Sequence, residues 1–276
     1  MASPPRARGG IPATTGRRPM ARGELHGRAS GASGASVGPA APLTAYAPVR
    51  PPIRRTAAEA VAFLRQRSVL ADDPALPRGQ GRPVLVLPVL GRGDRHTVPM
   101  RGALERLGYR PFGWGLGTNA GPTPRLLAGV EHRLLALHAE HGPLDLVGFS
   151  LGGVFARLLA HRHPDKVRQV ATVCSPFREI VDSAFLPLRP FLRAWGTPDL
   201  PDLAAEASRP LPVPGTFLFS RTDGIVAWES CIEPSRPEDC FEVPGPHVGI
   251  GQNPAVLAIL ACRLGRDLSG EAPSRG

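Results

Sequence analysis

Residues 144–164 read LDLVGFSLGGVFARLLAHRHP and place a serine between two glycines, where one repeating pattern gives way to another. The first six residues, LDLVGF, form a short apolar run that is typical of a buried strand. Ser150 follows, and the residues after it have the apolar spacing of a helix. The stretch therefore predicts a strand, a tight turn that contains Ser150, and a helix.

The residues around Ser150 match the pattern G-x-S-x-G, from Gly148 through Phe149 and Leu151 to Gly152. So tight a turn forces the serine into a strained backbone conformation, and side chains two residues to either side would clash. A helix that starts directly after the serine also directs N–H groups and the positive end of its dipole towards the reacting atoms. The motif in this context predicts a nucleophilic serine.

Strand and helix patterns alternate along the rest of the chain. Strands are expected at 83–90, 109–115, 144–149, 168–174, 215–220 and 240–243, and helices at 97–107, 122–142, 150–163 and 254–268. This alternation predicts an α/β fold with a doubly wound, mainly parallel sheet. Residues 176–212 interrupt the alternation with an apolar, proline-containing stretch, which we interpret as a small helical, lid-like insertion.

The N-terminal segment differs in composition from the rest of the chain. Residues 1–55 contain nine arginines and one acidic residue, so most of the net charge of +10 lies there. Rich in Ala, Pro and Gly, this tail is predicted to be disordered. A helix that docks on the domain is expected at 56–72, and the domain itself over 56–270. The tail lacks interleaved aromatic residues, so we expect no nucleic-acid partner.

Targeting and metal-binding signals are missing from the sequence. No stretch approaches the roughly 18 apolar residues of a membrane span, and no apolar run follows Arg17-Arg18 as in a signal peptide. We therefore expect a cytoplasmic protein with no transmembrane segment. None of the four cysteines forms a CxxC pair, so no metal or other cofactor is expected. Cys231 and Cys240 form either a disulfide, if the protein is exported, or two free thiols, which the lack of an export signal favours.

From about residue 80 to 265 the sequence resembles the α/β-hydrolase superfamily, specifically its lipase- and esterase-like serine members. The resemblance implies a catalytic triad in the chain order serine, acid, histidine, with the acid after the strand that follows any lid. Asp223 in FLFSRTDG and His247 in EVPGPHVG occupy these positions. It also implies two oxyanion-hole N–H donors. One is Leu151, and the other is Val89 or Leu90, because this chain has Pro-Val-Leu where many relatives have a glycine.

The residues themselves favour the same acid and base, with named alternatives. Because Ser150 lies at the carboxyl edge of the sheet, the base must come from a loop there. Of eight histidines, His247 fits best and His96 is the rival. The alternatives to Asp223 as the acid lie in the polar loop that follows it: Glu229, Glu233 and Asp239.

Together these features predict hydrolysis of a small-molecule carboxylic ester, with a hydrophobic acyl chain, through an acyl-enzyme. Candidate pocket residues are Trp114, Phe149 and Phe177, for which packing in the core is the alternative. An acyltransferase or thioesterase that uses the same triad is the first alternative function. A non-catalytic binding protein of the same fold is the second.

Overall fold

A computed structural model of the protein describes residues 74–180 and 200–268, together with positions 49, 51, 52, 54, 55 and 59. All of them belong to the compact unit Ala41–Gly276. The predicted disordered tail and the predicted helix at 56–72 lie outside the described residues, apart from those single positions. The middle of the predicted insertion, 181–199, does so too.

Six parallel strands form one sheet in the order β2-β1-β3-β4-β5-β6. β2 lies beside β1 at one edge of the sheet. The chain then crosses to the other side of β1, where β3, β4, β5 and β6 follow in order to the opposite edge. The loops after β1 and β3 meet where this direction changes, which is the usual place for a ligand site in such a sheet. The strands are β1 Pro83–Leu87, β2 Arg110–Gly113, β3 Leu144–Phe149, β4 Val167–Val173, β5 Gly215–Phe219 and β6 Cys240–Glu242.

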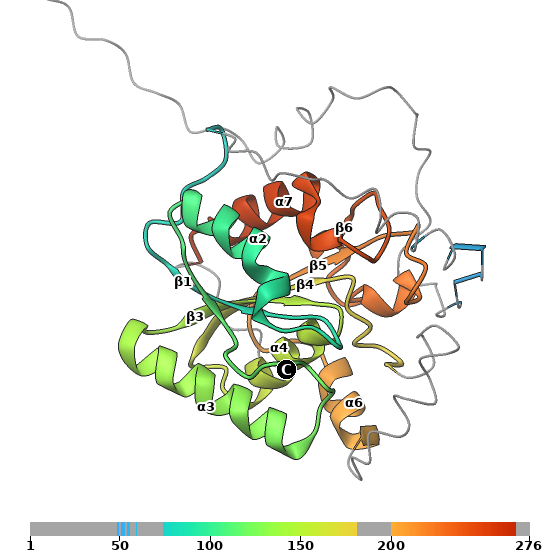
Figure 1. Cartoon of the computed structure of the whole chain (residues 1–276), viewed down its shortest axis with the longest axis horizontal. Coiled ribbons are helices and arrows are strands. Elements are labelled where there is room, and N and C mark those ends of the chain that lie inside the picture. The colour runs from blue at the N-terminus through green and yellow to red at the C-terminus, as the bar shows by residue number, and fades with distance from the viewer. Residues whose placement is uncertain are drawn as a thin grey trace, which may run out of the picture. The chain divides into compact units, whose positions relative to one another are not determined.

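Helices cover both faces of the sheet (Figure 1). Helices α2 and α7 share one apolar cluster with the strands, and helices α3, α4 and α6 share another. Their bounds are α2 Asp94–Arg106, α3 Pro124–His141, α4 Leu151–Arg162, α6 Leu200–Ser208 and α7 Pro254–Leu264.

Strand β1 shows why its sequence is apolar throughout. Leu85 and Leu87 belong to the cluster of α3 and α4, whereas Val84 and Val86 belong to the cluster of α2 and α7. Successive side chains of a strand point to opposite faces, so a strand with helices on both sides needs apolar residues at every position.

The predicted α/β fold with a parallel sheet is confirmed, with small shifts at the ends of elements. Strand β1 ends at Leu87 rather than at residue 90, because Pro88 has no N–H for the ladder. Helix α2 begins at Asp94, earlier than predicted, and helix α6 forms part of the predicted insertion. In the part of the chain that the structure describes, no helix has both the length and the apolar character needed to span a membrane.

Candidate active site

Ser150 lies in the turn between β3 and α4 with φ +50° and ψ −121°. Such a backbone conformation costs a non-glycine residue about 1–3 kcal/mol and persists only where the surroundings hold it. Here the Ser150 N–H donates to the carbonyl of Val173 at 2.9 Å. A Cβ on Gly148 would collide with the backbone of Gly152, and a Cβ on Gly152 would collide with the carbonyl of Leu87. Both flanking glycines are thus required sterically, as the motif predicted.

Asp223 and His247 come from the loops after β5 and β6 and meet through a hydrogen bond. His247 Nδ1 lies 2.6 Å from Asp223 Oδ2. The other carboxylate oxygen, Oδ1, accepts from the N–H groups of Ile225 at 2.8 Å and Val226 at 2.9 Å. Because the carboxylate is buried and fixed at both oxygens, it holds the Nδ1 proton of the imidazole and leaves Nε2 as the acceptor.

Glu59 is a buried acidic residue that the sequence analysis missed. Its Oε1 accepts from the N–H groups of Gly224 at 2.8 Å and His247 at 2.7 Å, and its Oε2 accepts from Val248 N–H at 2.8 Å. Since Gly224 follows Asp223 directly, one carboxylate ties together the loops that carry the acid and the imidazole. No motif reveals this role: 165 residues separate Glu59 from Gly224, and its partners are backbone groups.

The two carboxylates also shift the pKa of the imidazole. Burial acts to lower the pKa of His247, but Asp223 and Glu59 act in the opposite direction and outweigh it. The pKa of His247 is therefore raised from its ordinary value of 6.5.

The rival base and acids have other surroundings. His96 lies in the same cavity, but none of the described residues forms a hydrogen bond with its ring. Burial lowers the pKa of His96, as do the nearby Arg92 and His247. The three alternative acids are bound elsewhere: Glu229 by the N–H of Val49, Glu233 by Arg157, and Asp239 by Arg263.

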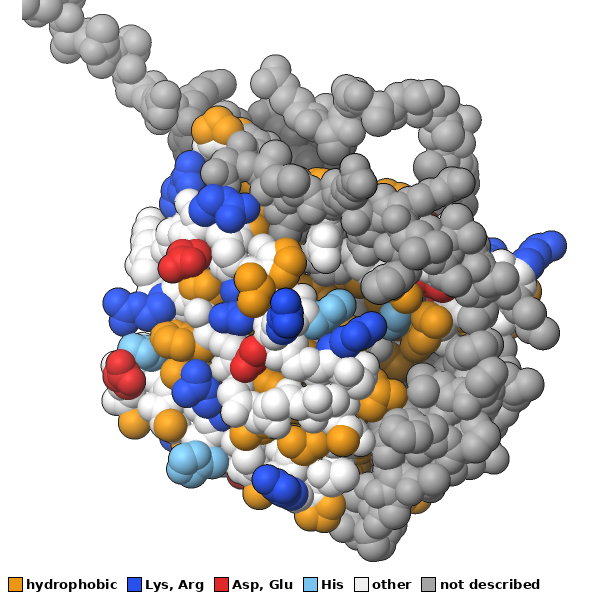
Figure 2. All heavy atoms as spheres, in the orientation of Figure 1, with side chains coloured by type: hydrophobic (Ala, Val, Ile, Leu, Met, Phe, Trp, Pro, Cys, Tyr) orange, Lys and Arg blue, Asp and Glu red, His pale blue; other side chains and the backbone are white. Residues whose placement is uncertain are grey.

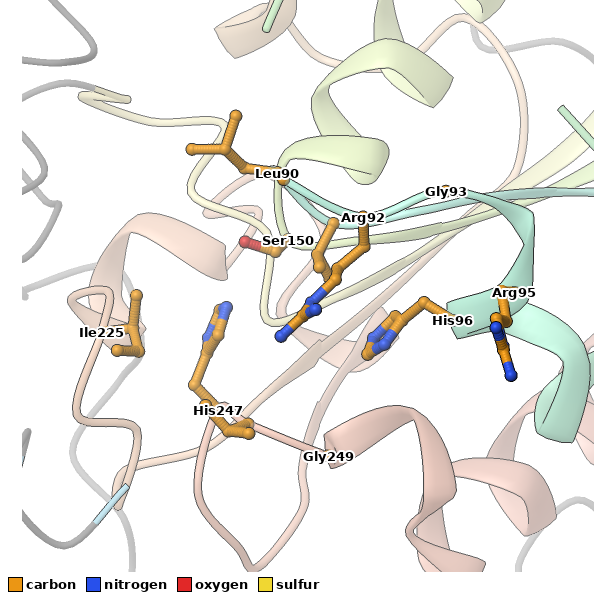
Figure 3. Close-up of a pocket in the computed structure, with 12 residues that line it drawn as sticks. Leu90, Arg92, Gly93, Arg95, His96, Ser150, Ile225, His247 and Gly249 are labelled. Carbon is orange, nitrogen blue, oxygen red and sulfur yellow. The ribbon is translucent and has the colours of Figure 1, made fainter. Parts of the chain in front are cut away.

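Ser150 and His247 line one cavity of about 620 Å³, a size typical of small-molecule sites. Figure 3 shows their side chains near one another, with Leu90 and Ile225 to one side and Arg92 to the other. Within the described part of the chain, no group forms a hydrogen bond with the Ser150 hydroxyl. Its oxygen is therefore available to a ligand.

The loop after β1 carries both predicted second donors of the oxyanion hole. Val89 and Leu90 line the cavity, and the buried side chain of Asn119 holds the start of their loop by donating to the carbonyl of Pro88 at 2.8 Å. Among the described residues, no acceptor takes the N–H of Val89, Leu90 or Leu151. All three remain candidate donors.

The predicted pocket aromatics lie in the core instead of the cavity lining. Trp114 and Phe177 are fully buried, and Phe149 is 3% exposed. The guanidinium of Arg157 covers the ring of Phe177 at 3.8 Å, and the Trp114 ring packs edge-on against Phe155. None of the three is among the described residues that line the cavity. Apolar residues near strand ends look alike in sequence whether they face a pocket or the core.

All four cysteines are free thiols, so the alternative without a Cys231–Cys240 disulfide describes this structure. Burial raises the pKa of the Cys174 thiol well above its ordinary value, and the neighbouring Asp223 adds to this effect. Cys174 is therefore protonated and is no rival nucleophile to Ser150. The described residues contain no cluster of three or more His, Cys, Asp or Glu side chains that could hold a metal ion.

Comparisons with known proteins agree with the fold. Residues 127–199 match the family model for the alpha/beta hydrolase fold. Over 70 residues the chain is 41% identical to a pimeloyl-[acyl-carrier protein] methyl ester esterase from Chromobacterium violaceum. That match spans 25% of this chain and 27% of the relative's length. An alpha/beta superfamily hydrolase from Oenococcus oeni PSU-1 superposes with a TM-score of 0.50 at 14% identity, over 71% of this chain and 100% of that one.

Proposed function

We propose that the chain, which has the alpha/beta hydrolase fold, is a serine hydrolase that cleaves carboxylic esters through Ser150, Asp223 and His247. The observation that carries the proposal is the 2.6 Å hydrogen bond between His247 Nδ1 and Asp223 Oδ2. The cavity beside this pair is the one that Ser150 lines. The Chromobacterium violaceum relative, named a methyl ester esterase, supports an ester as the substrate class.

In the first half of the reaction the Ser150 hydroxyl attacks the ester carbonyl carbon. His247 Nε2 takes the hydroxyl proton as the bond between Oγ and the carbon forms, and Asp223 stabilises the resulting imidazolium. The oxyanion of the tetrahedral intermediate accepts hydrogen bonds from Leu151 N–H and from the loop of Val89 and Leu90. One such donor is worth about 3–4 kcal/mol of transition-state stabilisation.

Collapse of the intermediate breaks the bond between the carbonyl carbon and the leaving oxygen. The imidazolium of His247 gives its proton to that oxygen, so the alcohol leaves neutral and the acyl group stays on Ser150. A water molecule then attacks the acyl-enzyme, with His247 again as base. The products are the carboxylic acid and free Ser150.

The apolar side of the cavity supports a hydrophobic group on the substrate. Leu90 and Ile225 line the cavity next to Ser150, and Leu90 also packs against the main core (Figure 3). Burial of an alkyl chain there contributes about 0.8 kcal/mol for each buried CH₂. We therefore assign an apolar part of the substrate, rather than a polar one, to this side.

Labelling with a fluorophosphonate probe, followed by mass spectrometry of the modified peptide, tests the proposal. The wild-type protein should be labelled on Ser150 and should hydrolyse 4-nitrophenyl esters. Ser150→Ala should lose both properties, whereas Ser208→Ala, which removes an exposed hydroxyl on α6, should retain both. Equal labelling of the wild type and Ser150→Ala, or labelling of neither, would refute the assignment.

A further inference from the structure

The two sides of the cavity around Ser150 differ in charge. Leu90 and Ile225 line one side, whereas Arg92, Arg95 and His96 line the other. No Asp or Glu is among the described residues that line it. Figure 2 shows Lys or Arg side chains (blue) next to His side chains (pale blue) near the middle of the face that it draws. The described lining therefore carries a net positive charge.

Arg92 points into this site. Figure 3 shows its guanidinium extending between His247 and His96, with Arg95 beyond His96. Its charge acts on the imidazole beside it, since Arg92 is one of the groups that lower the pKa of His96. The side chain belongs to the same loop as the candidate oxyanion donors, so it lies close to where a substrate carbonyl would bind.

The described residues offer Arg92 and Arg95 no acidic partner. By contrast, the buried Arg157 is paired with Glu233 at 3.0 Å and the partly buried Arg168 with Asp145, whereas Arg92 and Arg95 are exposed at the mouth of the cavity. A guanidinium without a partner at the edge of a cavity presents a fork of N–H donors that fits a carboxylate or a phosphate.

We propose that the substrate ester carries an anionic group, a carboxylate or a phosphate, that binds to Arg92, with Arg95 adding charge at the outer edge. The ester carbonyl then lies at Ser150 and the apolar part of the substrate lies against Leu90 and Ile225. This inference rests on the proposed function of Ser150. The anion has two sources, the acyl half or the alcohol half of the ester, and both offer Arg92 the same chemistry.

Two pairs of esters separate these sources. In the first pair, mono-4-nitrophenyl adipate has a carboxylate where 4-nitrophenyl hexanoate has a methyl group. In the second, the hexanoate ester of 4-hydroxyphenyl phosphate has a phosphate that phenyl hexanoate lacks. The ratio of kcat/KM for the charged ester over the neutral one should exceed about five in one pair at low ionic strength, because a charge-assisted hydrogen bond in a half-exposed site contributes about 1 kcal/mol.

Two variants test whether Arg92 causes the preference for the charged ester. Arg92→Gln should lower the preferred ratio about fivefold, to near one, since the amide cannot neutralise an anion. Arg125→Gln is the matched control, because it removes the same charge from an exposed position at the start of α3. Its ratio should equal that of the wild type. A ratio near one in both pairs for the wild type, or a preference that Arg92→Gln leaves unchanged, would overturn the proposal.

A binding measurement makes the test independent of turnover. Calorimetry with adipate and with phenyl phosphate should show binding of at least one to the wild type, and binding about fivefold weaker to Arg92→Gln. Binding that depends on Arg92 in a protein that neither turns over esters nor labels at Ser150 would support the anion site and refute the hydrolase. Labelling at Ser150 with no binding of either anion and no preference for charged esters would support the hydrolase and refute the anion site.

Discussion

Replacement of Glu59 by glutamine should slow ester hydrolysis and shift its pH dependence. The carboxylate accepts three hydrogen bonds, from the backbone N–H groups of Gly224, His247 and Val248. A glutamine keeps one carbonyl oxygen for the first two donors but turns an NH₂ group towards the third. The lost hydrogen bond to a charged acceptor and the unsatisfied N–H together cost about 1.5–3 kcal/mol of unfolding free energy.

The effect on rate follows from the position of the imidazole. If the loop of His247 relaxes by about 1 Å, kcat/KM should fall about 100-fold, because the reacting atoms lose their alignment. The pH profile supplies a second readout. His247 must be neutral to act as base, so kcat/KM rises with pH through the pKa of His247, which Asp223 and Glu59 raise. Removal of the Glu59 charge should lower that pKa and move the acid limb of the profile to lower pH.

The assay is kcat/KM for a 4-nitrophenyl ester from pH 5 to 9, with thermal unfolding in the same buffers to show that each variant is folded. Glu105→Gln, which neutralises an exposed carboxylate on α2, is the control and should match the wild type. A folded Glu59→Gln protein with kcat/KM within twofold of the wild type and an unmoved acid limb would refute the positioning role. A lower melting temperature with no shift in the acid limb of the pH profile would show that Glu59 has only a structural role.

Three further predictions concern the acid, the oxyanion loop and the thiols. Asp223→Asn should fold normally and lose about 10⁴-fold in kcat for ester hydrolysis, because the amide no longer fixes the imidazole tautomer; near-normal kcat would move the acid role elsewhere. Asn119→Ala should lower kcat about tenfold or more and change KM much less, because the loop that begins at Pro88 loses the hydrogen bond that holds it near the oxyanion. Steady-state kinetics would measure kcat and KM separately, and an unchanged kcat would exclude the loop as a donor. In the native protein a thiol reagent should titrate Cys262 rapidly, as the one exposed cysteine, and should titrate the half-buried Cys240 more slowly; all four thiols should react after denaturation, and rapid reaction of Cys174 or Cys231 in the native state would contradict their burial.

The fold and the central part of the site could be predicted because their causes are local in sequence. The elbow at Ser150 needs glycines at fixed offsets, and a strand with helices on both faces needs an unbroken apolar run. The positions of Asp223 and His247 were also predictable. In a parallel sheet, loops that follow strands share one edge, so a polar residue after β5 and another after β6 were expected to lie together.

Glu59 and the aromatic residues show where such reasoning ends. The acceptor of three backbone N–H groups needs no complementary side chain, so nothing near residue 224 or 247 indicates that a carboxylate from residue 59 will be there. Phe177 was expected in the pocket because it follows a strand end. A buried guanidinium, that of Arg157, takes up the face of its ring instead, and this contact joins residues from α4 to a loop after β4. Both arrangements depend on three-dimensional packing of distant segments.

The net charge of the whole chain also does not predict the charge around the candidate site. The chain contains 33 Lys and Arg residues, and its net charge of +10 is concentrated in the first 55 positions, so composition alone indicates nothing about a substrate. What a substrate experiences is the charge within a few ångströms of the ester, where the screening of solvent is weakest. There the relevant residues are few: Arg92, Arg95 and the two histidines that line the cavity. A guanidinium that the described residues leave unpaired beside a nucleophile can therefore determine which esters bind, whereas the larger charge of the N-terminal segment need not.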